Sequence, residues 1–465
     1  MASTQRHAVV VGASMAGVLA ARALTHTFDR VTLVDRDRMP REPVNRGGVP
    51  QGRHTHGLLA RGCEVIEELF PGTVDDLVAR GAKLGDAQAD VRWHFGAAPL
   101  AAGTSGLRIL GVSRPLLEWY LRHRLLTHPR VEVLEGTSVL DLAFTGDTRR
   151  VNGVIVTEGA GHEPHLLPAR LVVDASGRTS RLPEWLERRG YPAPEEEVRR
   201  IDKHSTTRTF RRSPGDGPLA VVVPAGPWNP RGGVMVAEEG DRWTATLNGM
   251  GDIRPPTDLD GFLAYAGSLG SPAIADTLAG ATPLDEGMVY RFPANRRRHY
   301  ERLTELPAGL LATGDSLCAF DPVLAQGMTV AGLEARDLAL LLAKHGDDIG
   351  PELARRFHAR AAAHIDTPWT LVTGAAPRPV AAYRRWLLAA AQTDPELAAA
   401  FLRIGQLVDR PTELLRPRVA LRVARHAAGG ALRSRGEPGP TTRVSAGSRR
   451  ARAATLPARR AAPHG

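Results

Sequence analysis

Apolar runs and helical spacing alternate at the start of the chain and predict a βαβ unit. The runs at residues 8–11 and 31–34 have the length and composition of buried parallel strands. Between them, a helical pattern of apolar positions continues to about His26. Because parallel strands joined by helices build doubly wound sheets, this part of the chain predicts an α/β fold.

The pattern then predicts two more helices, a series of short strands and a second sheet. One helix begins near His56, and another covers residues 111–129 with Ser113 near its N-cap and Pro115 in its first turn. Alternation between residues 191 and 290 favours an antiparallel sheet with an inserted helix at 259–269. The short strands lie at residues 131–134, 139–144, 151–157 and 171–174, and the sheet segments include 220–223, 233–236 and 242–247.

The last third returns to the first pattern and ends in helices. A buried strand within residues 309–315 precedes a loop, which opens a long helix at about Met328. Residues 351–428 have the spacing of three or four amphipathic helices. Beyond Gly429 the chain has too little apolar surface to fold, so a basic disordered tail is expected.

Composition narrows the classes of protein that this chain can be. The formal net charge is +10, but residues 431–465 hold eight arginines and one acid, Glu437, so seven of these charges lie in the tail. A basic tail without interleaved aromatic residues is weak support for nucleic-acid binding, and no nucleic-acid partner is expected. Cys63 and Cys318 are too few and too far apart for a disulfide scaffold or a zinc site. With no run long enough to span a membrane, a cytoplasmic protein is expected.

The most informative chemistry lies between the two strands of the βαβ unit. Gly12, Ser14 and Gly17 stand at the spacing of a dinucleotide-binding loop, with Ser14 at the place of the usual middle glycine. The first glycine permits the turn, and the third lets helix and strand pack closely. Backbone N–H groups at the helix start then face a pyrophosphate, and Asp35 at the tip of the second strand suits a ribose hydroxyl.

Other loops add candidate ligands on the same edge of the sheet. Arg53 lies in a loop beside the nucleotide fold and has the fork geometry for a phosphate or a flavin carbonyl. Asp174 ends a buried strand and opens a turn of small residues. The neighbouring pair His54 and His56 has no third ligand nearby, so no metal site is expected.

With these residues established, the chain resembles the single-component FAD-dependent monooxygenases of the para-hydroxybenzoate hydroxylase fold. Within them it looks closest to the bacterial squalene-epoxidase-like enzymes that epoxidise polyenes in polyether biosynthesis. Over about residues 7–345 the resemblance rests on four motifs, GASMAG with Asp35, PQGRHTHGLLARG, DASGRTSRLPEWL and GDSLCAFDPVLAQGMTVAGLEA. The chain departs at Asp321 and Leu324–Ala325, where the group usually has Asn and Tyr-Gly, and this departure bears on substrate choice.

The resemblance turns the pattern into an expected architecture. It implies a FAD-binding Rossmann-like βαβ domain, an antiparallel-sheet substrate domain and a C-terminal helical layer. The expected boundaries are residues 1–190 for the first part of the FAD-binding domain, 191–300 for the substrate domain, 301–350 for the return segment of the FAD-binding domain, 351–429 for the helical layer and 430–465 for the tail.

The resemblance also implies roles for single residues. Asp35 would bind the adenosine ribose, Arg114 would lie near the pyrophosphate, and Asp315 would meet the ribityl chain. The turn from Pro322 to Met328 would place amides near the flavin ring. Together with the motifs, this gives the expected cofactor-binding residues Gly12, Ala13, Ser14, Met15, Ala16, Gly17, Asp35, Arg36, Arg53, Arg114, Asp174, Gly314, Asp315, Pro322, Gly327 and Met328.

The implied reaction is the insertion of one oxygen atom from O₂ into a lipophilic small molecule through a flavin C4a-hydroperoxide, most simply alkene epoxidation in bacterial secondary metabolism. The cofactor carries this chemistry, so no catalytic side chain is assigned. FAD is the expected cofactor, and NADPH is a transient reductant unless a partner protein supplies the electrons. The oligomeric state stays open.

Three alternatives share the fold. An aromatic hydroxylase would need a base that activates a phenol, and a prenyl reductase would consume no oxygen. A flavin-dependent halogenase would use a lysine, for which Lys83 is the candidate among three lysines.

Overall fold

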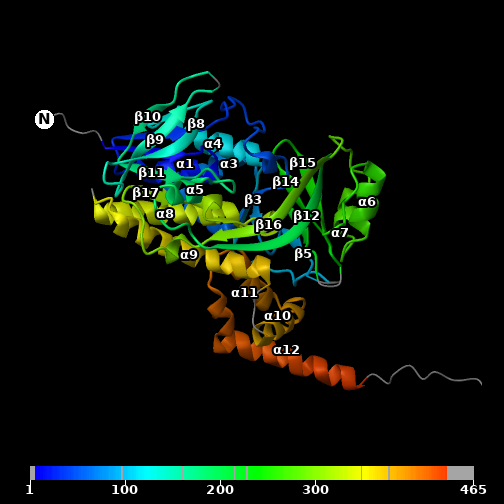
Figure 1. Cartoon of the computed structure of the whole chain (residues 1–465). Helices are drawn as coiled ribbons and strands as arrows, with labels where there is room; N and C mark the ends of the chain where they lie inside the picture. The colour runs from blue at the N-terminus through cyan, green and yellow to red at the C-terminus, as the bar shows by residue number, and fades with distance from the viewer. Residues whose placement is uncertain are drawn as a thin grey trace, which may run out of the picture.

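The computed structural model describes residues 6–95, 98–159, 161–213, 215–226, 229–346, 348–374 and 378–436, with side chains up to residue 428. Figure 1 shows a body built around two sheets, with a smaller group of helices below it. Within the described part, no helix is both long and apolar enough to cross a membrane.

A five-stranded parallel sheet forms the first half of the body, in the order β17-β11-β1-β2-β7. Its central strands are apolar and almost wholly buried, because α1 packs on β1, β2 and β11, and the antiparallel strand at Val151–Thr157 lies against β11. The helix α1 connects β1 to β2 and also packs on α8, and α8 packs on α9. The bounds are β1 His7–Val11, α1 Met15–Leu24, β2 Arg30–Val34, β7 Val131–Leu134, β11 Leu171–Asp174, β17 Leu310–Ala312, α8 Gly327–His345 and α9 Pro351–Thr373.

Smaller elements surround this sheet. The capped helix predicted at 111–129 is α4 (Arg114–Leu126), where the Ser113 side chain accepts a hydrogen bond from the Leu116 amide. Two three-stranded sheets have the orders β10-β9-β8 and β3-β6-β4. The remaining bounds in this half are η1 Pro50–Arg53, β3 Gly57–Leu58, α2 Ala60–Leu69, α3 Thr73–Ala79, β4 Lys83–Asp86, β6 Arg108–Gly111, β8 Ser138–Phe144, β9 Val151–Thr157, β10 His165–Pro168, α5 Leu182–Glu187, η2 Tyr300–Arg302 and η3 Gly314–Ser316.

The second sheet has seven strands in the order β18-β16-β12-β15-β14-β13-β5. All neighbours are antiparallel except β13 and β5. One face packs on α6 and α7 around an apolar core that includes Phe210, Met235, Trp243 and Phe262. The bounds are β5 Val91–Trp93, β12 Glu196–Arg211, β13 Ala220–Val223, β14 Arg231–Glu238, β15 Arg242–Met250, α6 Leu259–Gly267, α7 Ala273–Leu278, β16 Met288–Arg298 and β18 Cys318–Ala319.

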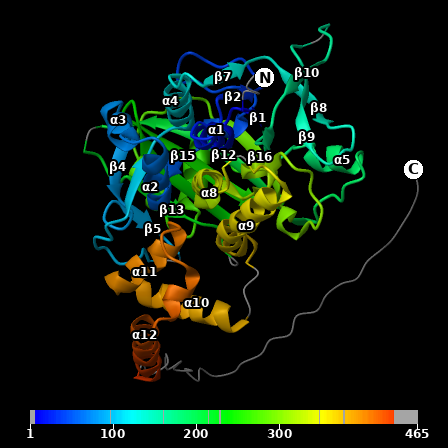
Figure 2. The same ribbon diagram turned by 90° about the vertical axis from the view of Figure 1, so that its left-hand side faces the viewer.

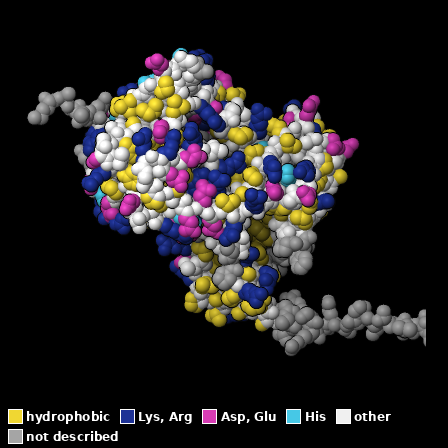
Figure 3. All heavy atoms as spheres, in the orientation of Figure 1, with side chains coloured by type: hydrophobic (Ala, Val, Ile, Leu, Met, Phe, Trp, Pro, Cys, Tyr) yellow, Lys and Arg dark blue, Asp and Glu magenta, His cyan; other side chains and the backbone are white. Residues whose placement is uncertain are grey.

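The helices α10 (Arg378–Ala391), α11 (Pro395–Gly405) and α12 (Pro417–Gly436), with η5 (Pro411–Leu415), form the group below the body. Figure 2 places them beside β5, and their apolar side chains share a core with Leu100 and Leu107. On the face shown in Figure 3, basic and acidic side chains intersperse over the body. This agrees with the small net charge that the sequence leaves to the body.

Two sequence-based boundaries were wrong. The helix expected near His56 is α2, which begins at Ala60, because Gly57–Leu58 pairs with β6 as the short strand β3. Helical structure also runs past the boundary expected at residue 430, since the backbone of α12 remains helical to Gly436. Residues 437–465, the remainder of that predicted tail, lie outside the described residues.

Candidate functional site

The loop between β1 and α1 has the close approaches of a nucleotide-binding turn. Gly12 has φ +102°, and a Cβ there would lie 2.6 Å from the Ala175 carbonyl oxygen. A Cβ on Gly17 would lie only 1.9 Å from the Gly12 carbonyl oxygen. Both positions therefore require glycine. The structure brings the predicted residues Gly12, Ala13, Ser14, Met15, Ala16 and Gly17 together at the carboxyl edge of the sheet.

The start of α1 and the end of β2 are tied to each other at this edge. Ser14 is the N-cap of α1, but its side chain makes no capping bond to the first turn. The amide of Ala13 donates to Asp35 Oδ2 at 2.7 Å, and the amide of Asp37 donates to Asp35 Oδ1 at 2.9 Å. The predicted ribose ligand thus lies beside the positive end of a helix, where a dinucleotide is favoured.

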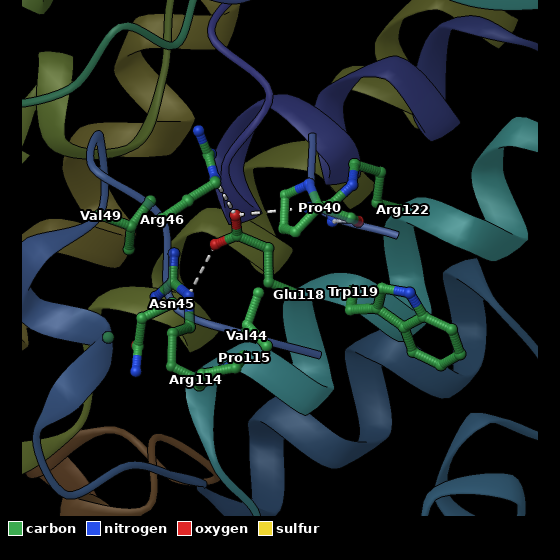
Figure 4. A pocket seen from close by; sticks show the side chains of 11 residues that line it. Pro40, Val44, Asn45, Arg46, Val49, Arg114, Pro115, Glu118, Trp119 and Arg122 are labelled. Carbon is green, nitrogen blue, oxygen red and sulfur yellow. Dashed lines mark hydrogen bonds and ion pairs between the residues drawn. The ribbon is translucent and has the colours of Figure 1, made fainter. Parts of the chain in front are cut away.

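Figure 4 shows a buried group of charges next to this loop, which we call the Glu118 cluster: Glu118, Arg46, Arg114 and Arg122. Glu118 Oε1 lies 2.8 Å from Arg46 Nε, and Glu118 Oε2 lies 2.9 Å from Arg114 Nε. Arg122 Nη1 is 3.7 Å from the same carboxylate. Burial alone would raise the pKa of Glu118, but Arg114 and Arg46 outweigh it, so this pKa is lowered.

The Glu118 cluster connects the predicted residue Arg114 to the nucleotide loop. Arg114 Nη2 donates to Ser14 Oγ at 2.7 Å, and Ser14 Oγ donates to Glu118 at 3.0 Å. Arg46 continues the network, since its Nη1 lies 2.9 Å from Asp37 and 3.4 Å from Asp35. A small pocket lies between α4 and the segment 40–52. Arg46 and Glu118 were not predicted from the sequence, although Glu118 stands one helical turn after Arg114.

The return strand β17 delivers Asp315 to the same region. Gly314 has φ +62°, and a Cβ there would lie 2.5 Å from the Ala16 Cβ, so this turn packs directly on α1. Asp315 is solvent-exposed between buried neighbours. Desolvation by the surrounding protein nevertheless raises the pKa of its carboxyl. The charges of Arg114 and Arg178 act in the opposite direction but do not cancel this effect. Asp315 therefore faces the space between the nucleotide loop and Arg178.

The amides around Asp315 are held from behind by α8. Glu334 Oε2 accepts hydrogen bonds from the Thr313 hydroxyl and the Gly314 amide, both at 2.7 Å. Burial raises the pKa of Glu334 to about 7. Since both donors belong to the turn that carries Asp315, Glu334 fixes the backbone from which Asp315 projects.

Asp174 lies at the end of β11, and its role as a cofactor ligand stays a prediction. It is buried and accepts hydrogen bonds from the Ser176 amide at 3.0 Å and from the hydroxyls of Ser176 and Ser180, both at 2.5 Å. The Gly177 amide in turn donates to Ser316 Oγ at 3.0 Å. Asp174 therefore organises the turn after β11 and joins it to the turn of Asp315.

Arg178 and Tyr290, which the sequence analysis did not single out, link that turn to the second sheet. The Arg178 guanidinium lies over the Phe292 ring at 5.7 Å, and its Nη1 is buried without a hydrogen-bond partner. Burial raises the pKa of Tyr290, against Arg178, which also hydrogen-bonds to it. The Tyr290 ring lies 5.1 Å from the ring of His54. A line of contacts thus runs from the nucleotide loop to the second sheet.

The histidine pair is bound by hydrogen bonds. His54 Nδ1 lies 2.6 Å from Thr207 Oγ1, and His56 Nδ1 lies 2.7 Å from the His54 carbonyl oxygen. Burial lowers the pKa of His54 to about 4 and that of His56 to about 3, so both rings are neutral at pH 7. Nowhere in the described ranges do three His, Cys, Asp or Glu side chains gather as a metal site would require.

The turn before α8 completes the candidate site. Pro322 is exposed, Ala325 has φ +53°, and Met328 is buried in the first turn of α8. Gln326 Nε2 donates to the Gly405 carbonyl at 3.0 Å, which fastens the C-terminal helices to this turn. Arg36 and Arg53 both have exposed side chains. The predicted residues thus fall into one group around the start of α1 and a second group around η3 and the start of α8, and Asp315 belongs to the second.

Comparison with known proteins agrees with this architecture. The flavin-dependent brominase Bmp2 covers 92% of this chain and all of its own, at TM-score 0.63 and 16% identity. The p-nitrophenol 4-monooxygenase PnpA from Pseudomonas putida covers 87% of this chain and 99% of its own, at TM-score 0.60 and 18% identity. At these identities the likeness shows the fold, and the predicted α/β fold of the flavin-dependent monooxygenases is confirmed.

A relationship in sequence is also present. No profile of a known protein family matches the chain. Protein Rv3254 of Mycobacterium tuberculosis (strain ATCC 25618 / H37Rv) is 35% identical over 428 residues, which cover 87% of this chain and 90% of that protein. An identity of this size over nearly the whole of both chains shows common descent, and the chain therefore belongs to the family of Protein Rv3254.

Proposed function

We propose that the protein is a FAD-dependent monooxygenase that transfers one oxygen atom from O₂ to a lipophilic small molecule. The observation that carries the proposal is the glycine loop at the start of α1, where Gly12 and Gly17 leave no room for a Cβ and Asp35 lies beside the helix N-terminus. That arrangement suits a dinucleotide. The likeness of the fold to flavin-dependent enzymes supports a dinucleotide that carries a flavin.

The residues present fit FAD along the whole line of contacts. The first turn of α1 and Arg114 would hold the pyrophosphate, and Asp35 would bind the adenosine ribose. Asp315 would meet the ribityl chain, because it is the exposed carboxylate between Arg114 and Arg178. The unpartnered Nη1 of Arg178 is a buried donor that lacks an acceptor, as expected where a polar ligand group belongs.

Bound FAD would supply the redox chemistry, accepting two electrons from a nicotinamide nucleotide and activating O₂. The chain's own contribution is to place and shield this chemistry. The N-terminus of α8 favours negative charge in front of Gly327. The hydrogen bond from Gln326 to the Gly405 carbonyl oxygen ties the C-terminal helices to the same turn. The turn is thereby held in place, and a pre-organised site of this kind needs no rearrangement when charge develops on the cofactor.

The second sheet offers a wall of mixed character for the substrate. Val222, Val234 and Val236 form an apolar patch on the face opposite α6 and α7, together with the side chain of Trp93. Beside His54, the same sheet carries hydroxyl groups that hydrogen-bond to one another. Thr207 Oγ1, for example, lies 2.6 Å from Thr246 Oγ1. A largely apolar molecule with one polar end would fit such a wall, which supports a lipophilic substrate.

Alkene epoxidation is the reaction we favour within this class. The His54 ring lies 5.1 Å from the Tyr290 ring, and its pKa of about 4 makes His54 a weak base at neutral pH. An alkene needs no protein base, whereas a phenol does. Aromatic hydroxylation is the second candidate, because His54 and Tyr290 together could still polarise a phenol. The halogenase alternative has less support, since Lys83 Nζ is engaged with Asp241 at 3.0 Å.

The cofactor assignment predicts that Asp35→Asn lowers the affinity for FAD at least about tenfold, because a charged acceptor for the ribose hydroxyls is worth roughly 1.5–3 kcal/mol. Flavin fluorescence after dialysis measures the retained cofactor. Asp29→Asn, which removes a charge at the other end of β2 in a half-exposed pair with Arg6, is the matched control. Equal retention in both variants would show that Asp35 does not bind the ribose.

The reaction assignment predicts that ¹⁸O from labelled O₂ appears in an epoxide when the flavin-loaded enzyme receives NADPH and a lipophilic alkene. Mass spectrometry of the products measures the label. Labelled products from phenols alone would make the protein an aromatic hydroxylase. Halogenated products that vanish on Lys83→Ala would make it a halogenase, and hydrogenated products without label would make it a reductase.

A further inference from the structure

A buried ion pair joins the second sheet to the turn before α8. Lys203 Nζ on β12 lies 2.6 Å from Asp321 Oδ1, and the two side chains are 2% and 6% exposed. The other lysine of a described ion pair, Lys83, keeps 29% of its side chain exposed. Because burying two charges is costly unless they pair well, the position of Lys203 calls for an explanation.

The backbone of β12 is deformed where Lys203 leaves it. The pairing of β12 with β16 shifts register between Arg200 and Lys203. Within that irregularity Asp202 has φ +40°, an uncommon value for a residue other than glycine. Bulges of this kind re-aim side chains and are frequent beside active sites. Here the bulge delivers the Lys203 ammonium to the turn.

On the other side of the pair, Asp321 organises the turn itself. Its amide donates to Asn295 Oδ1 at 2.5 Å, and its Oδ1 accepts the Val323 amide at 3.1 Å as the N-cap of η4 (Pro322–Leu324). Ala325 then adopts the left-handed conformation, and α8 begins two residues later. The ion pair therefore fixes the turn that leads into the N-terminus of α8.

We propose that Lys203 is a positioning residue for the turn before α8, and that it neutralises the charge of Asp321 in that turn. This inference rests on the proposed FAD function. An unpaired carboxylate in this turn would repel the negative charge that a reduced flavin develops in front of α8, whereas an unpaired ammonium would attract it. The ion pair holds the turn in one conformation. Because the pair carries no net charge, it does so without shifting the midpoint potential of the flavin.

Two variants of opposite charge test the inference. Lys203→Met leaves the carboxylate alone and should lower the midpoint potential of bound FAD, measured spectroscopically in mildly alkaline buffer. Asp321→Asn leaves the ammonium alone and should raise it. The double variant should return the potential close to that of the wild type, and the melting temperature of the FAD-free protein should recover in the same way. Lys83→Met, which opens a partly exposed pair, is the control and should change neither quantity.

The outcomes separate this inference from the function on which it rests. If the wild type binds no FAD, the proposed function fails and the inference falls with it. If the wild type binds FAD but both single variants shift the potential in the same direction, or not at all, only the inference is overturned. If Lys203→Met does not fold, the other two variants still test the inference. Asp321→Asn should raise the midpoint potential, and the double variant should return it to the wild-type value.

Discussion

Gly17→Ala is expected to unfold the nucleotide loop and to abolish FAD retention. The added Cβ would lie 1.9 Å from the Gly12 carbonyl oxygen, a backbone atom that cannot move without breaking the turn. The loop is already fixed from the other side, since the Gly12 amide donates to the Val34 carbonyl at 2.8 Å. Overpacking a tight contact costs about 1–3 kcal/mol, and more where backbone must shift, so about 3 kcal/mol or more is expected here.

The measurement is the free energy of unfolding by denaturant, together with the flavin retained after gel filtration. Gly267→Ala is a matched control, because Gly267 also belongs to a helix, α6, and its Cβ would meet its nearest neighbour, the Ala275 Cβ, at 3.9 Å. That variant should be neutral or slightly stabilising, as Ala is favoured over Gly in helices. A Gly17→Ala protein of unchanged stability would contradict the loop geometry.

The elements that the sequence predicted well are those whose signal is local. The strands β7, β9, β11 and β13 have the predicted bounds, because each is a short segment rich in valine between turn residues. The helix α4 carries its own cap at Ser113. Such signals lie within a few residues of the element that they specify, so no partner strand is needed to recognise them.

The elements that the sequence analysis did not predict depend on distant partners. The strand β12 has the sequence EEVRRIDKHSTTRTFR, with no run of apolar residues. It is a strand because β15 and β16 pair with its two edges and supply partners for its hydroxyls, such as Thr246 for Thr207. Its polarity hid both the strand and Lys203, whose role depends on a bulge that no local pattern predicts.

The same distinction applies to the candidate site. The glycine loop and Asp35 could be proposed from the sequence because their spacing is a local motif. Arg46 stands in a polar, glycine-rich connection, and only the folded chain shows that it meets Glu118, 72 positions later. Asp174 could be proposed as a cofactor ligand because it ends a strand, but the hydrogen bonds from Ser176 and Ser180 to its carboxylate become visible only in the folded chain.

The second large effect is expected on the stability of the protein when the Glu118 cluster loses its carboxylate. Glu118→Ala should destabilise the protein by about 3–5 kcal/mol, because removing one partner of a buried ion pair leaves the other charge uncompensated. Here Arg46, Arg114 and Arg122 would all lose a carboxylate within 3.7 Å. Replacing Glu352 by Ala is the control, since its pairs with Arg355 and Arg356 are largely exposed and should contribute little to stability.

The pH dependence of unfolding distinguishes the contribution of the Glu118 charge from the contribution of its packing. The pKa of Glu118 is lower in the folded protein than its ordinary value, because Arg114 and Arg46 overcome the effect of burial. Its carboxylate therefore stabilises the fold above the unfolded pKa, and this contribution is lost as the pH falls through the lower folded pKa. Denaturant titrations of the wild type and of Glu118→Gln, which keeps the shape, should differ most near neutral pH and converge in acid. A difference that stays constant down to the acid limit would mean that Glu118 acts through its shape and that its charge does not hold Arg46 and Arg114 at the nucleotide loop.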